Sequence, residues 1–292
     1  MKKYILVTLI LSMLFFSSCN VGKHEKYASL IADSANDRYS LEPEVEYWTG
    51  IYFEKKNMED KTCHLFGKSY SGSYYLSIVD KYNSYTTDVY YTDDGIRFGL
   101  RSDTGELVEI NFINSTFFNT QPYLPEVDHP TESAISLATE IAGNFIDNLD
   151  DYTQILEEPV TQHKERNGET YSITYYVVKF TKKVKGFISS DFISVKVTSK
   201  GTVATICLGD IGAFDDVTLD FDIETVNQSI ANKIKNTYEN TGFQVKNSSC
   251  HNQKIVLTPK GEICISSRYY IDGLDVSNVE IQTAIVILTV VS

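Results

Sequence analysis

The chain has 292 residues, and its 26 lysines and arginines against 39 aspartates and glutamates give a formal net charge of −13 at pH 7. An acidic surface of this kind repels nucleic-acid phosphates and anionic lipid headgroups, so we expect neither as a partner. The length suffices for one large domain or two to three small ones.

The N-terminus has the pattern of an export signal. Met1-Lys2-Lys3 is a short positive segment, and an apolar run follows from Tyr4 to Phe16. At ~1.5 Å per helical residue the run spans ~20 Å, which is shorter than the ~30 Å hydrocarbon core of a bilayer. We therefore interpret it as the apolar region of a signal peptide and not as a membrane-spanning helix.

The run ends in Phe16-Ser17-Ser18-Cys19. Small residues before a cysteine resemble the bacterial lipobox, although Phe16 replaces the usual leucine. The resemblance implies a signal peptide at 1–18, lipidation of Cys19 with acyl chains such as palmitate, and a lipid anchor and polar tether at 19–45. Two acyl chains anchor stably, so we expect a lipoprotein at the outer face of a bacterial cell membrane. An ordinary signal peptide followed by a chance cysteine is the alternative.

The sequence of residues 46–130 predicts a β-rich domain. Strand-forming runs at 47–53, 73–79 and 88–91 are followed by turns at Asp94-Gly95 and Thr104-Gly105. Glycine at these positions supplies the positive φ that tight hairpins require. We expect an antiparallel β-meander that closes with a link containing three prolines, the last of which is Pro130.

Two later segments repeat the same order of elements. A helix beginning near Thr131 has an apolar face that includes Ile141, and strands follow it at 171–180, 192–197 and 202–208. A second helix, with Ile234 on its apolar face, precedes strands at 254–258, 263–270 and 281–291. We predict an α+β fold in which 131–212 and 213–292 are two helix-on-antiparallel-sheet units, with Ile141 and Ile234 buried against the strands.

The repeated units resemble the PepSY and YcdB-like group of extracellular bacterial domains. The resemblance is carried by the helix at 133–142 and by the strand–turn–strand segments around Gly105, Gly201 and Gly261. It implies a helix laid across an antiparallel sheet and, by analogy with propeptides of thermolysin-type peptidases, binding and restraint of a secreted hydrolase. The family carries no catalytic residues that transfer to this chain.

The sequence offers no recognisable catalytic or metal-binding motif. It lacks H-E-x-x-H, G-x-S-x-G and C-x-x-C, and its histidines have no metal-ligand spacing. We therefore expect no enzyme activity, no metal and no cofactor. Cysteines Cys63, Cys207, Cys250 and Cys264 allow three disulfide pairings, which an exported setting permits, and buried single thiols are equally consistent with Cys207 and Cys264.

Tyrosine is the one marked compositional bias, with 20 residues. Exposed tyrosines suit recognition of sugars or proteins, and a candidate surface contains Tyr74, Tyr75, Tyr90 and Tyr91. The wet face of an antiparallel sheet is the alternative explanation of these four residues.

Two functions follow as hypotheses. The first is a non-catalytic protein-binding or regulatory module for a secreted peptidase or cell-wall enzyme, and the apolar terminal strand at 282–291 is its candidate pairing edge if nothing in the fold covers it. The second is a surface adhesin or ligand-capture lipoprotein that uses the tyrosine-rich sheet.

Overall fold

The computed structural model describes residues 28–33, 42–47, 51–80, 85–166, 169–215, 217–239, 241–258 and 261–291. The predicted signal peptide and Cys19 lie outside these residues. The described part is mostly β and holds two α-helices, α2 (Pro130–Ala142) and α3 (Ile223–Glu239), with two short 3-10 helices, η2 (Phe118–Tyr123) and η3 (Leu149–Asp151). None of the helices in these ranges is long and apolar enough to cross a membrane.

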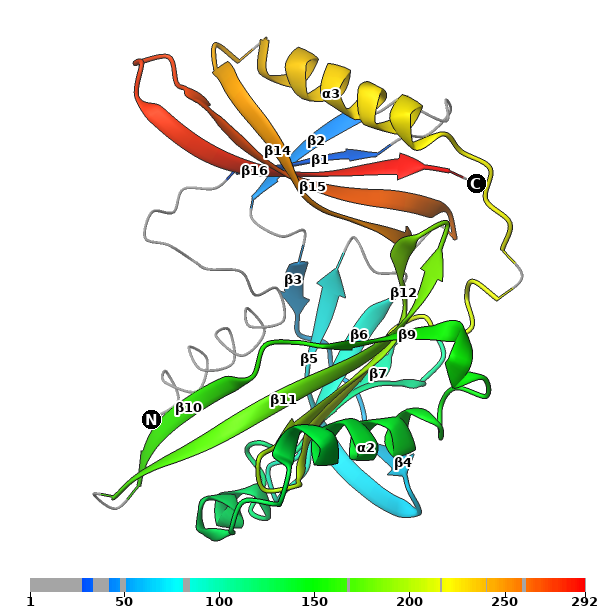
Figure 1. Ribbon diagram of the computed structural model, residues 1–292, viewed down its shortest axis with the longest axis vertical. Coiled ribbons are helices and arrows are strands. Elements are labelled where there is room, and N and C mark those ends of the chain that lie inside the picture. The colour runs from blue at the N-terminus through cyan, green and yellow to red at the C-terminus, as the bar shows by residue number, and fades with distance from the viewer. Residues whose placement is uncertain are drawn as a thin grey trace.

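The described strands form one curled, mixed sheet of 16 strands (Figure 1). Its main path runs in the order β2-β1-β16-β15-β14-β12-β13-β8-β7-β6-β5-β3, while β9 and β10 pair with β11, which pairs with β12, and β4 pairs with β5. The strands are β1 (Ala28–Asp33), β2 (Glu42–Tyr47), β3 (Ile51–Glu54), β4 (Lys61–Leu65), β5 (Lys68–Asp80), β6 (Thr86–Tyr91), β7 (Arg97–Arg101), β8 (Leu107–Asn111), β9 (Tyr152–Leu156), β10 (Val160–Arg166), β11 (Glu169–Val184), β12 (Phe187–Thr198), β13 (Val203–Leu208), β14 (Gln244–Leu257), β15 (Ile263–Leu274) and β16 (Glu280–Val290).

The sheet divides into two halves that meet at one strand pair. The large half contains β3 to β13 with α2, and the small half contains β1, β2 and β14 to β16 with α3. They join where β12 runs parallel to β14, at Ser189 and Ile255. Each helix covers its own hydrophobic cluster, and the cluster under α3 also takes in Val184 and Phe187 from the ends of β11 and β12 in the large half.

Helix α2 packs on β11 and β12 of the large half. Proline at its first position fits a helix start, because the missing N–H would have no intrahelical acceptor there. Its buried face consists of small residues and one isoleucine, namely Ala134, Ala138, Ile141 and Ala142. They meet the alternating apolar residues of the strands beneath, Val178, Phe180, Ile193, Val195 and Val197. The predicted burial of Ile141 is confirmed.

Helix α3 covers the small half. Asp222 caps its start, because its Oδ2 accepts the Thr225 N–H at 3.0 Å and its Oδ1 accepts the Glu224 N–H at 3.4 Å. The buried stripe recurs at four-residue steps, with Val226, Ile230, Ile234 and Tyr238. It rests on the strand residues Ile265, Ile271, Ile285 and Ile287. The predicted burial of Ile234 is confirmed.

The predicted α+β fold, a separate meander followed by two helix-on-antiparallel-sheet units, is wrong. The segments do not close as separate sheets, because strands from different predicted units pair with each other. Strand β8 of the predicted meander pairs with β13 at Ile110 and Ile206, and β12 pairs with β14 across the predicted boundary between the two units. Pairing satisfies backbone groups that separate sheets would leave open at their edges.

The expected tether also contributes strands. Strands β1 and β2 pair antiparallel with each other, and β1 runs parallel to β16 at Ile31–Val286 and Ala32–Ile287. The terminal strand β16 therefore has neighbours on both sides, β1 and β15. It is not the open edge that the sequence suggested.

Candidate functional site

The four tyrosines of the predicted surface lie on two faces of the large half. Tyr90 is 1% exposed and stacks on Phe98 with 5.3 Å between ring centroids. Tyr74 packs edge-on against Tyr90 at 5.8 Å, while Tyr75 packs against Tyr91 at 5.2 Å. Because Tyr90 belongs to the core, the structure does not bring the four side chains together as one exposed patch.

The four described cysteines have the properties of unreactive thiols. No disulfide bond is present among the described residues, which include Cys63, Cys207, Cys250 and Cys264. Burial raises the pKa of the Cys63, Cys207 and Cys250 thiols, which disfavours the nucleophilic thiolate. Within the described ranges, no group of three or more histidine, cysteine, aspartate and glutamate side chains is placed to hold a metal ion.

Two buried carboxylates of the large half accept hydrogen bonds on opposite faces of the sheet. Asp191 is 0% exposed, and its oxygens accept hydrogen bonds from the Tyr152 hydroxyl at 2.6 Å and the Gly212 N–H at 3.0 Å. Asp210 accepts the Ser190 hydroxyl at 2.7 Å. Neighbouring residues of a strand point to opposite faces, so Ser190 and Asp191 direct their partners apart. The two carboxylates fix the chain after β13 and do not converge on a shared site.

Among the described residues, the N-terminal part of β14 has a strand partner on one side and forms an open edge on the other. Residues 244–253 pair with β15 on one side, whereas the pair with β12 on the other side is at Ile255. Residues 244–252 are exposed on both faces of the strand. The outward N–H and C=O groups of an edge strand have no strand partner and can accept one. About ten residues of β14 therefore offer a pairing edge.

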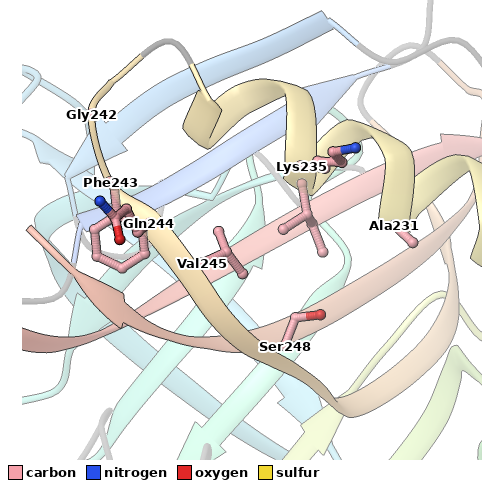
Figure 2. A pocket seen from close by; sticks show the side chains of 8 residues that line it. Ala231, Lys235, Gly242, Phe243, Gln244, Val245 and Ser248 are labelled. Carbon is pink, nitrogen blue, oxygen red and sulfur yellow. The ribbon is translucent and has the colours of Figure 1, made fainter.

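A groove lies beside this edge, between β14 and the C-terminal half of α3 (Figure 2). Its volume is ≈ 580 Å³. Ile234 is 2% exposed and contributes the most buried side chain of the lining. The lining residues are Ala231, Ile234, Lys235, Gly242, Phe243, Gln244, Val245 and Ser248.

The local sequence explains why the groove stays open. At one end Gln253 Nε2 donates to Asn227 Oδ1 at 2.9 Å, which ties β14 to the first half of α3. At the other end the rings of Tyr238 and Phe243 pack with centroids 4.9 Å apart. Between these two ties the facing positions Ala231 of α3 and Ser248 of β14 carry small side chains. Small side chains cannot fill the space between the helix and the strand.

The mouth of the groove is apolar with charge around it. Val245 is exposed beside Phe243, and Val276, from the turn between β15 and β16, is 78% exposed. Gly242 packs closely against Val276, because a Cβ placed on this glycine would lie 2.8 Å from the Val276 side chain. Lys246 pairs with Glu280 at 2.8 Å across the strands. Exposed apolar groups next to an open edge are typical of an interaction site.

Sequence reasoning missed this edge because it looked for apolar alternation. The run Asn247-Ser248-Ser249-Cys250-His251-Asn252-Gln253 has no apolar face, and the predicted strand began only at Lys254. Structure extends β14 back to Gln244. The sequence feature that could have identified this edge is a strand-length polar segment with no apolar face.

Comparison of the chain with protein-family models, with curated proteins and with solved structures finds no match.

Proposed function

We propose that the chain is a lipid-anchored extracytoplasmic protein that binds an extended segment of a partner protein along the edge of β14. The observation that carries this proposal is the coincidence of an open strand edge, at 244–253, with a groove that runs beside it under α3. Strand addition of this kind draws affinity from backbone hydrogen bonds and specificity from pockets that receive alternate side chains.

The groove defines what the bound segment would present. Successive side chains of an added strand point to opposite faces, so every second one would face α3. Those side chains would meet Ile234, Phe243 and Val245, which favour an apolar group of modest size. The opposite side chains would project from the other face of the sheet, so the site selects alternate positions of the segment.

The expected location of the protein favours a secreted partner. The export signal and Cys19 would hold the protein at the outer face of a bacterial membrane, where a secreted peptidase or cell-wall enzyme is within reach. The resemblance to peptidase-restraining domains favours the same class of partner. An extended segment of such an enzyme, bound as an added strand, would be held without being cleaved.

The test uses full-length protein in detergent and a phage-displayed library of extended decapeptides. Ser248 faces α3, since it pairs with the buried Ile271, whereas its neighbour Ser249 points to the other face. We expect Ser248→Lys to weaken binding of the selected peptides about tenfold or more, because it places a charge in the groove.

Ser249→Lys is the matched control, because it adds the same charge to the same exposed strand. We expect its affinity to stay within about twofold of the unaltered protein, since its side chain lies outside the groove. Equal affinity of both variants and the unaltered protein would contradict the proposal, as would hydrolysis of the selected peptides.

A further inference from the structure

A second surface lies on the small half, on the face of β14, β15 and β16 that α3 does not cover (Figure 1). The strand register pairs Tyr270 of β15 with Ser249 on one side and with Ala284 on the other. Directly paired residues share a face, and Ile271, the next residue after Tyr270, packs under α3. Tyr270 and its two neighbours therefore point away from the helix.

Polar side chains surround Tyr270 on this face. On β15, Arg268 comes two residues before it and Asp272 two residues after it, so each lies about 7 Å from it along the strand. In the neighbouring strands, Asn252 pairs with Arg268. Gln282 pairs with Asp272 in the same way. We call these five residues the Tyr270 face.

The Tyr270 ring is a half-buried platform in the middle of the face. The paired residues Ser249 and Ala284 have side chains too small to reach over the ring. The ring of His251 packs beside it, with the centroids 5.1 Å apart and the planes inclined by 60°. A supported aromatic ring offers an apolar contact surface at a low cost in side-chain entropy.

The end of the face at Arg268 consists of hydrogen-bond donors without partners. In the part of the chain that the structure describes, neither the half-buried Arg268 guanidinium nor the Asn252 side-chain amide has a hydrogen-bond or ion-pair partner. Arg97 of the large half, in contrast, forms an ion pair with Glu109. A planar guanidinium with open N–H groups matches a carboxylate, which can accept two parallel hydrogen bonds from it.

The end of the face at Asp272 consists of hydrogen-bond acceptors. The Asp272 carboxylate accepts a hydrogen bond from Gln282 Nε2 at 2.7 Å, which fixes its position. A carboxylate can accept about four hydrogen bonds, so Asp272 keeps the capacity to accept more. It lies ~13 Å from Arg268 along the strand, with the Tyr270 ring between them. The face therefore offers a charged donor, an apolar ring and an acceptor in one row.

We propose that the Tyr270 face binds a carbohydrate that carries a carboxylate, such as a uronic acid. The apolar C–H face of the sugar ring stacks on Tyr270, and the sugar carboxylate accepts hydrogen bonds from Arg268 and Asn252. Sugar hydroxyls donate to Asp272 at the other end. The site lies on the opposite face of the sheet from the groove beside β14 and does not depend on the proposed function.

Charge complementarity at this site is local. The chain has a formal net charge of −13, so its overall field does not attract an acidic sugar. Binding must therefore come from the guanidinium and the ring. A salt concentration of about 0.15 M limits the repulsion from distant acidic residues, because it screens charges that lie more than ~8 Å apart.

The experiment is calorimetric titration of the full-length protein in detergent, at that salt concentration, with short oligosaccharides of galacturonate, alginate and hyaluronan. The carboxyl-reduced form of each oligosaccharide is the matched neutral ligand. We expect saturable binding of at least one acidic oligosaccharide, and binding of its reduced form that is about tenfold weaker or more. Binding of none of the three, or equal affinity for the reduced forms, would overturn the proposal.

Variants assign the binding to the face, after thermal melting has checked that each of them folds. Arg268→Gln should lower the affinity for the acidic oligosaccharide to that of its reduced form, and should leave the affinity for the reduced form unchanged. Tyr270→Leu should weaken both ligands about tenfold, whereas Tyr270→Phe keeps the ring and should stay within about threefold.

Lys233→Gln is the control for charge, because it removes one positive charge from α3 on the other side of the sheet. It should keep the full affinity for the acidic oligosaccharide. The site would be contradicted if Lys233→Gln lost as much affinity as Arg268→Gln, or if Arg268→Gln and Tyr270→Leu both bound the acidic oligosaccharide as the unaltered protein does.

Discussion

The two halves of the sheet each carry one helix, and the helix of the small half borders a groove. In the large half α2 lies over β11 and β12, strands that have paired neighbours on both sides. In the small half α3 lies next to β14, which has no second strand partner along most of its length in the part of the chain that the structure describes. A helix over the middle of a sheet closes a core, whereas a helix beside an open edge can frame a binding site.

The residues of the two helices account for the difference. Helix α2 presents Ala134, Ala138 and Ala142, all 0% exposed, to strands that alternate apolar and polar residues. Helix α3 presents larger side chains to the isoleucines of β15 and β16, and its backbone approach to β14 is less extensive than that of α2 to β12. The half of β14 that faces the groove is polar and contributes nothing to the core. The buried side chains of α3 therefore pack mainly on residues of β15 and β16.

The largest expected effect tests whether the two cores are independent. Ile230→Ala empties a fully buried position of α3, and we expect a loss of about 2–5 kcal/mol in the stability of the small half. Because the two clusters are separate and only Val184 and Phe187 of the large half reach the cluster under α3, the calorimetric transition of the large half should keep its melting temperature within a few degrees. A single transition that shifts as a whole would show that the halves unfold together.

A matched pair of substitutions compares the two helices directly. Ala138→Leu overfills the contact between α2 and its strands, and we expect about 1–3 kcal/mol of destabilisation in urea unfolding. Ala231→Leu occupies an exposed groove position on α3, so its effect on stability should stay within about 0.5 kcal/mol.

The affinity for selected peptides should respond to the same two substitutions in the opposite order. Ala231→Leu fills the groove and should lower the affinity for selected peptides several-fold, while Ala138→Leu should leave it unchanged in the folded protein. Equal costs in stability for the two substitutions would remove the distinction between a closed and an open helix contact.

The smallest effect concerns the cap that starts α3. Hydrogen bonds from Thr225 lower the pKa of Asp222 in the folded protein. A lowered folded pKa means that the cap stabilises fully above the unfolded value of about 3.9 and stops doing so as pH falls through the folded pKa. Asp222→Ala should therefore melt a few degrees lower at neutral pH, and the gap should close in acid.

Asp222→Asn provides the control, because asparagine also caps but does not titrate. Its melting temperature relative to Asp222→Ala should not change between pH 7 and pH 3. A gap between Asp222 and Asp222→Ala that does not narrow at all as pH falls below the unfolded pKa of about 3.9 would show that the carboxylate does not act as the cap.

Local patterns predicted the elements well and their assembly poorly. The four-residue steps of Val226, Ile230 and Ile234 mark α3 because they depend on one helix alone, and glycine-containing turns such as that at Gly95 mark hairpins in the same way. Pairing between β8 and β13, or between β1 and β16, joins segments far apart in the chain, and periodicity within each strand does not specify its partner.

The candidate site was hidden for a related physical reason. An edge strand that buries neither face leaves no apolar pattern, so residues 244–253 resembled a loop. The terminal strand β16 is strongly apolar because it has β1 on one side and β15 on the other, and its pattern pointed to the wrong edge. The polarity of a strand, which weakens the prediction of its existence, is what marks it as an edge.

Hydrogen–deuterium exchange of the β14 amides tests the open edge most directly. The full-length protein is measured alone and with a selected peptide, and β15 serves as the internal reference because it lies between β14 and β16. We expect the outward-facing amides of 244–253, about half of them in an antiparallel pair, to exchange rapidly in the free protein and to become protected by the peptide. Amides of β14 as protected as those of β15 in the free protein, or unaffected by the bound peptide, would contradict strand addition at this edge.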